Sequence, residues 1–72
     1  MDIKLFATLR EGRGKTVEIE WYKGINGFAV LKELGLEPDE VKIFLINGLN
    51  SIPDVELKSD DIIALFPAVG GG

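Results

Sequence analysis

Apolar and polar side chains alternate with a period of two in two segments near the N-terminus, residues 3–10 and 16–21. A period of two places successive side chains on opposite faces of an extended strand. Residues 11–15, between the segments, include two glycines, which adopt the positive φ angles of tight turns without steric cost. The two segments are therefore predicted to form an antiparallel β-hairpin with one apolar face.

One helix is predicted after the hairpin, between Asn26 as its N-cap and Gly35 as its C′ residue. Ile25 precedes the cap at the position of a hydrophobic staple. The apolar residues of this segment recur at helical spacing on one face: Val30, Leu31 and Leu34. Gly27 lies in the first turn, where it is expected to weaken the helix by up to about 1 kcal/mol relative to alanine.

Three further extended segments follow the helix. Residues 41–46 are apolar at almost every position, so the sequence leaves open which side chains of this strand face the core. After an Asn47-Gly48 turn, residues 51–53 are expected to form a short edge piece, and residues 62–66 the last strand. One helix on one face of a mixed sheet of four to five strands is an α+β arrangement, the β-grasp fold, with the first and last strands parallel neighbours.

The composition excludes several classes of function. The chain of 72 residues is long enough for one domain, predicted over residues 1–67, with residues 68–72 as a flexible tail. It contains no cysteine and no histidine, and no nucleophile–base pair or metal cluster is visible, so neither an enzyme nor a metal site is expected. The net charge of −4 disfavours nucleic acid and anionic membranes as partners. The sequence has neither a secretory signal nor a membrane span, so a cytoplasmic location is expected.

The C-terminus offers the most specific chemical feature, because it ends on Gly70, Gly71 and Gly72 directly after an apolar strand. Glycine passes through a narrow channel, adopts backbone conformations closed to other residues and leaves the terminal carbonyl unhindered. Loose glycine-rich ends are also common, so an inert tail is one alternative. The apolar residues Ala68 and Val69 argue against that alternative, since disordered tails are normally polar.

A carboxylate at Gly72 is a poor electrophile until it is activated, for which a mixed anhydride with AMP is the usual biological route. Sulfide or a persulfide then displaces AMP to leave a C-terminal thiocarboxylate. A lysine amine displaces it to leave an isopeptide bond. With no cysteine in the chain, this terminus is the plausible place for covalently held sulfur.

The chain resembles the MoaD/ThiS-type ubiquitin-like sulfur carriers, and most closely the small subunit of molybdopterin synthase. The similarity is strongest over residues 59–72, where an apolar strand is followed by Phe-Pro, two small apolar residues and the glycines. Residues 3–11 are similar to the opening strand of the family, and residues 30–35 and 47–48 to its helix and a turn. Ala68 stands where a second proline is usual, and Ser59 where glycine is usual.

The resemblance implies that a ubiquitin-activating-like adenylyltransferase, which consumes ATP, activates Gly72 and that a sulfur donor then converts it to a thiocarboxylate. The tail would enter the large, catalytic subunit of molybdopterin synthase, Gly71 keeping it thin, and give its sulfur to a pterin precursor. The protein itself would bind no cofactor. The alternatives are a thiamine-type sulfur carrier, a ubiquitin-like modifier conjugated to proteins through Gly72, and an interaction domain with an inert tail.

A partner surface is expected beside the tail. If Ile3 and Leu5 face the helix, the two-residue period turns Phe6, and likewise Phe66, to the opposite face of the sheet. Such an exposed aromatic patch is typical of a docking site. The candidate partner-binding residues are Phe6, Leu45, Phe66, Pro67 and Val69, with Phe66 and Pro67 anchoring the tail.

Overall fold

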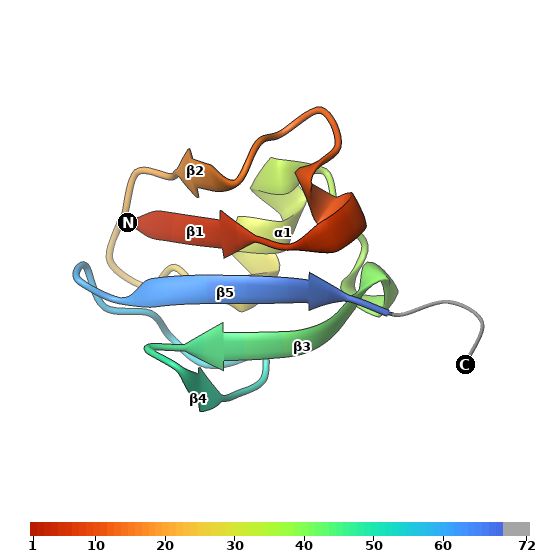
Figure 1. The fold of residues 1–72 in the computed structure, drawn as a ribbon. Coiled ribbons are helices and arrows are strands. Elements are labelled where there is room, and N and C mark those ends of the chain that lie inside the picture. The colour runs from red at the N-terminus through yellow and green to blue at the C-terminus, as the bar shows by residue number, and fades with distance from the viewer. Residues whose placement is uncertain (69–72) are drawn as a thin grey trace.

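The computed structural model describes residues 1–68 and shows one mixed sheet with a single α-helix packed on one face (Figure 1). In chain order the elements are β1 (Asp2–Leu5), the 3-10 helix η1 (Ala7–Arg10), β2 (Thr16–Glu18), α1 (Gly27–Leu34), the 3-10 helix η2 (Pro38–Glu40), β3 (Val41–Ile46), β4 (Leu49–Asn50) and β5 (Ile62–Pro67). The strand order is β2-β1-β5-β3-β4, with β1 and β5 parallel and the other neighbours antiparallel. The predicted β-grasp fold is confirmed.

The N-terminal hairpin forms, but its strands are shorter than predicted. The first strand ends at Leu5 instead of residue 10, because the backbone turns at Ala7, whose φ is 53°, into η1. The Arg10 Nε–H donates to the Leu5 carbonyl over 2.8 Å and stabilises this turn. Leu9 is thereby carried into the core, 5% exposed, from a position that the alternating pattern had assigned to the strand. The second strand ends at Glu18 instead of residue 21.

Both predicted ends of the helix are confirmed. Asn26 Oδ1 accepts the Ala29 N–H over 3.0 Å, which satisfies one of the free donors of the first turn. Gly35 adopts a left-handed conformation with φ of 76°, and the Leu36 N–H donates to the Leu31 carbonyl over 2.9 Å, as in a Schellman ending.

Gly27 has a packing role that its helix propensity does not reveal. A Cβ atom at this position would lie 2.6 Å from Cζ of Phe44 and 2.6 Å from Cα of Pro53. Real Cβ atoms essentially never approach other heavy atoms so closely. Glycine at position 27 weakens the helix by itself, but it is what allows α1 to pack closely against β3 and the loop at Pro53.

The third strand has the predicted bounds, and its two faces are now assigned. Phe44 lies opposite Leu65 and is only 4% exposed, so it faces α1, whereas Leu45 lies opposite Ala64 on the outer face. The predicted edge piece at residues 51–53 is wrong. The edge strand is β4, because Asn47 and Gly48 both have positive φ and form a tight two-residue turn after which pairing resumes at once.

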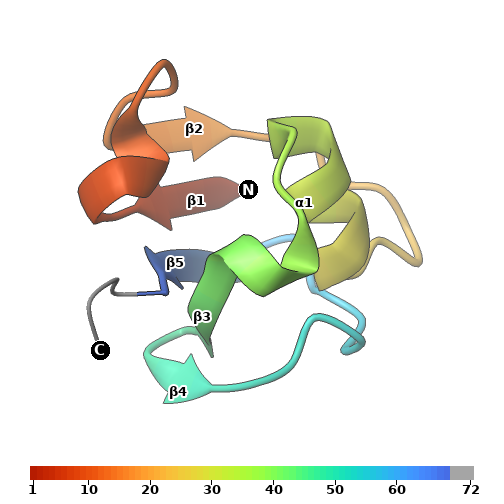
Figure 2. The same ribbon diagram turned by 90° about the vertical axis from the view of Figure 1, so that its right-hand side faces the viewer.

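The core lies between α1 and the inner face of the sheet, as the view along the strands shows (Figure 2). Its buried apolar residues are Ile3, Leu5, Leu9, Ile19, Ile25, Val30, Leu31, Leu36, Phe44, Leu57, Ile63 and Leu65. The one buried charged residue described is Asp61, whose carboxylate accepts bonds from Asn47 Nδ2 over 2.8 Å and the Lys58 N–H over 2.7 Å. Asp61 thus closes the turn that leads into β5. Within residues 1–68, none of the helices has the length and apolar character that a membrane crossing requires.

Candidate functional site

The candidate site lies at the carboxyl end of β5, the middle strand of the sheet. Because β1 and β5 are parallel, the carboxyl ends of both strands lie at the same end of the sheet, opposite the N-terminus (Figure 1). Pro67 lies opposite Val41, and the Ala68 N–H donates to the Glu40 carbonyl over 3.3 Å. We call Pro67 and Ala68 the tail root. The predicted tail residues Val69, Gly70, Gly71 and Gly72 lie outside the described residues.

Two phenylalanines from opposite ends of the sequence stack next to the tail root. The ring centroids of Phe6 and Phe66 are 4.2 Å apart and their planes differ by 8°. The Phe6 N–H donates to the Leu65 carbonyl over 3.2 Å, which extends the pairing of β1 with β5 far enough to bring the rings together. Arg10 Cζ lies 5.3 Å from the Phe6 ring centroid, within the range of a cation–π contact. These contacts hold Phe66 in a defined orientation.

The stack belongs to an apolar surface on the outer face of the sheet, the face turned away from α1. We call it the sheet patch, and its members are Phe6, Ile43, Leu45, Ala64 and Phe66. The register places Ile43 opposite Phe66 and Leu45 opposite Ala64, so these side chains share one face. Figure 2 shows α1 on the other side of the sheet. Ile43 is 41% exposed, and the sheet patch is a surface on which another protein can pack.

Three of the predicted partner-binding residues lie together in the structure, and a fourth lies on the opposite face of the sheet. Phe6, Leu45 and Phe66 lie together in the sheet patch. Pro67 follows Phe66 in the strand and therefore lies on the inner face, where it lines a hollow. Ile43 is not among the predicted partner-binding residues, because a strand that is apolar on both faces hides its parity and a register shift between Val41 and Ile43 breaks the alternation.

The hollow on the inner side of the tail root has a volume of about 420 Å³. It is lined by Thr8, Leu9, Glu11, Arg13, Leu36, Glu40, Pro67 and Ala68. Arg13 fixes one wall, because its Nε–H donates to the Leu34 carbonyl at the end of α1 over 3.0 Å and its Nη1 to the Leu9 carbonyl over 3.3 Å. Arg13 was predicted only as part of the turn over residues 11–15, and nothing in the local sequence indicates its long-range contact with the Leu34 carbonyl.

Residues 1–68 contain no group of three acidic, histidine or cysteine side chains arranged to hold a metal ion. What the site does offer is geometric: a rigid strand end, a stacked apolar surface on one side of it and a hollow on the other. Such an arrangement suits the presentation of the chain end to another protein.

The comparisons with known proteins agree with this geometry. A family model described as the ThiS family matches residues 3–72. The chain belongs to the ThiS family. The match spans the whole β-grasp domain and extends through the terminal glycines, and it confirms the resemblance to MoaD/ThiS-type ubiquitin-like sulfur carriers.

Solved structures give the same fold. A putative molybdopterin converting factor, subunit 1, from Pyrococcus furiosus is 25% identical, with a TM-score of 0.76 over 94% of this chain and 95% of that chain. Small archaeal modifier protein 1 from Haloferax volcanii is 26% identical, with a TM-score of 0.77 over 94% of this chain and 95% of that one. A chain from the complex of subunits 1 and 2 of the Helicobacter pylori molybdopterin-converting factor is 23% identical, with a TM-score of 0.58 over 99% of this chain and 96% of its own, and is similar in fold.

Replacing Phe66 with alanine is expected to weaken partner binding more than it weakens the fold. The ring is half-buried and stacked, so its loss should cost about 1–2 kcal/mol of stability, whereas central aromatic residues of an interface commonly contribute 2 kcal/mol or more to binding. Titration with the partner and urea unfolding measure the two effects. Ile62→Ala is the matched control, since Ile62 is exposed on the same face of β5 at its far end. A stability loss as large as the binding loss would mean that Phe66 serves mainly as core.

Proposed function

We propose that this protein is a sulfur carrier whose C-terminal glycine, Gly72, is adenylated and converted to a thiocarboxylate. It then donates sulfur to molybdopterin biosynthesis as the small subunit of molybdopterin synthase. The observation that carries the proposal is the family match through residue 72 on a chain whose central strand, β5, is followed in the sequence, after two further residues, by the terminal glycines.

The chemistry takes place at the carboxylate of Gly72. One carboxylate oxygen attacks the α-phosphorus of ATP, pyrophosphate leaves, and the acyl adenylate forms. Hydrogen sulfide anion, supplied by the sulfur donor, attacks the carbonyl carbon, and AMP leaves with the electrons of the broken C–O bond. The product is a thiocarboxylate in which sulfur has replaced one oxygen, with no net oxidation or reduction.

The contribution of the folded domain to this chemistry is positioning and not catalysis. The activating enzyme and the large subunit supply the reacting groups, and this protein supplies a docking surface and an arm of fixed length. Pro67, the last residue of β5, has no N–H to donate, and the Ala68 N–H, bonded to the Glu40 carbonyl over 3.3 Å, is the last backbone donor described at the tail root. The sheet patch, with the stacked pair Phe6 and Phe66 beside the tail root, orients the domain on its partner.

The proposed partners are a ubiquitin-activating-like adenylyltransferase, a sulfur donor and a large subunit of molybdopterin synthase. The Pyrococcus furiosus match, named as a molybdopterin converting factor subunit, favours this pathway. The Helicobacter pylori complex shows a protein of this fold assembled with a second subunit. A second candidate, conjugation of Gly72 to lysines of other proteins, is favoured by the similarity to small archaeal modifier protein 1, and a thiamine-type carrier remains the alternative within sulfur transfer.

The test is intact-mass spectrometry of the full chain after incubation with ATP, a sulfide source and the activating enzyme of the source cell. We expect a mass gain that equals the exchange of one oxygen for sulfur. Conjugates that shift other proteins by the mass of this chain would favour the modifier instead. If the enzyme forms no acyl adenylate with the chain, both covalent functions are excluded.

A further inference from the structure

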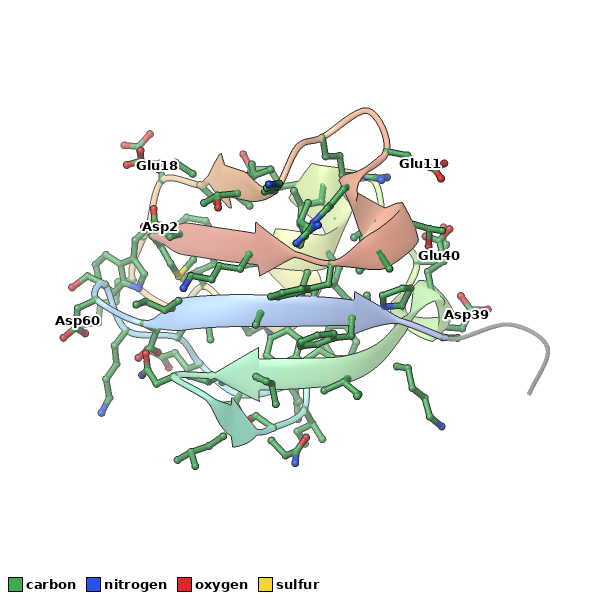
Figure 3. All side chains as sticks on the ribbon, in the orientation of Figure 1. Asp2, Glu11, Glu18, Asp39, Glu40 and Asp60 are labelled. Carbon is green, nitrogen blue, oxygen red and sulfur yellow. The ribbon has the colours of Figure 1, made fainter. Side chains whose placement is uncertain are left out.

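The hollow on the inner side of the tail root combines an apolar floor with an acidic rim. Leu9, Leu36 and Pro67 form the floor, and Glu11 and Glu40 are exposed at the rim. Figure 3 shows Glu11 and Glu40 at the end of the molecule where β5 finishes, with Asp39 nearby. The hollow therefore has an apolar floor and a negatively charged rim, and it lies directly beside the tail root.

One carboxylate of the acidic rim, that of Glu40, is held in place by the main chain. Glu40 Oε2 accepts the Glu37 N–H over 2.7 Å, which closes a capping box around η2. Arg13, the single cation among the lining residues, directs its guanidinium to the carbonyls of Leu34, Leu9 and Glu11. Two of its three guanidinium nitrogens, Nε and Nη1, are thus bonded to main-chain oxygens, and the lining residues together carry two carboxylates against one cation, a net negative charge.

We propose that a lysine or arginine side chain of the activating enzyme, which must receive the tail to adenylate it, binds in this hollow. Its aliphatic stem would lie over Leu9 and Leu36, and its cationic head would lie between Glu11 and Glu40. Long basic side chains combine an apolar stem with a charged tip, which matches a floor of leucines beneath a rim of carboxylates. The inference rests on the proposed function, because that function requires a partner at the tail root.

Position and openness favour a partner side chain over a free small molecule. Pro67 and Ala68 line the hollow, so a protein that accepts the following residues must pass directly over it. The hollow is open to solvent on one side, whereas small-molecule pockets bury most of the surface of their ligand. The sheet patch occupies the opposite face of the same strand end. A partner would thus hold the tail root from both sides, by apolar contact at the sheet patch and by charge at the hollow.

The test neutralises the rim without removing its hydrogen-bonding atoms. The double variant Glu11→Gln/Glu40→Gln loses two negative charges, and glutamine at position 40 keeps an acceptor for the capping box. The matched control is Asp2→Asn/Glu18→Gln, which removes the same charge from an exposed pair at the far end of the sheet (Figure 3). Thermal unfolding of both variants verifies that they are folded.

Affinity for the activating enzyme of the source cell, measured by titration at two salt concentrations, gives the readout. We expect the rim variant to bind about tenfold more weakly and to lose part of the salt dependence, with the control within about twofold of the unchanged chain. If both variants bind equally weakly, the effect comes from the net charge of the chain and the inference is overturned. An unchanged affinity of the rim variant would also overturn it. Neither result would affect the proposed function, which is tested separately by the mass gain of the unchanged chain.

A second variant keeps the test independent of the two glutamates. Thr8→Lys places a cation of the chain's own at the exposed wall of the hollow, where it would compete with the incoming side chain. We expect it to weaken binding while Glu11 and Glu40 stay unchanged. Tighter or unaltered binding would contradict occupation of the hollow by a basic side chain.

Discussion

Deletion of Gly72 is expected to abolish adenylation and sulfur transfer, although the shortened chain still ends on a glycine carboxylate. The deletion moves that carboxylate toward the fold by about 3.5 Å, the length of one extended residue. In positioned catalysis a displacement of about 1 Å can already lower the rate roughly 100-fold. If the tail root is docked at a fixed place, the carboxylate of Gly71 cannot reach the nucleotide. Intact mass after incubation with ATP, sulfide and the activating enzyme measures the loss.

The same deletion should leave the stability of the domain unchanged within about 0.5 kcal/mol, as for surface changes away from the core. Gly72→Ala is the companion variant, since it preserves the length of the chain and its carboxylate and adds one methyl group beside the reacting carbonyl. We expect it to retain more activity than the deletion. Full activity of the deletion would remove Gly72 as the reacting group, and a marked loss of stability would show that the tail is part of the fold.

Replacing Gly27 with alanine is expected to destabilise the domain by about 2 kcal/mol, although alanine is the better helix former. The new Cβ atom would meet the ring of Phe44 and the backbone of Pro53 at 2.6 Å. Overpacking typically costs about 1–3 kcal/mol, and a clash with the backbone of Pro53 places this cost near the upper end, against a gain of up to about 1 kcal/mol from helix propensity. For a domain of this size the net loss should lower the melting temperature by about 8–15 °C.

Phe28→Ala is the control for Gly27→Ala, because it introduces the same residue one position along the helix. Phe28 is 44% exposed, so we expect a change below about 1 kcal/mol. Thermal and urea unfolding compare the two variants. An increase in stability for Gly27→Ala would mean that β3 and the loop at Pro53 yield readily and that the close packing of α1 is not required.

The sequence predicted the features that depend on contacts between near neighbours. Asn26 and Gly35 mark the ends of α1 correctly, because capping involves groups within one turn of the chain. The bounds of β3 and the parallel pairing of β1 with β5 also follow from the sequence, since an apolar run and a right-handed crossover leave little choice. The first strand was predicted too long because Ala7 and Leu9 continue the alternation that the backbone turn at Ala7 interrupts.

The proposal that Gly72 is the reacting end comes from the sequence alone, through the terminal glycines and a similarity to sulfur carriers that the family match confirms. Only the tertiary structure decided what surrounds the tail root. Phe6 and Phe66 stack because the β1–β5 register places Leu5 beside Leu65, and one wall of the hollow is formed by Arg13, whose Nε–H donates to the Leu34 carbonyl at the end of α1. Both features join residues more than twenty positions apart, and local patterns hold no information on register or on which distant carbonyl a side chain will find.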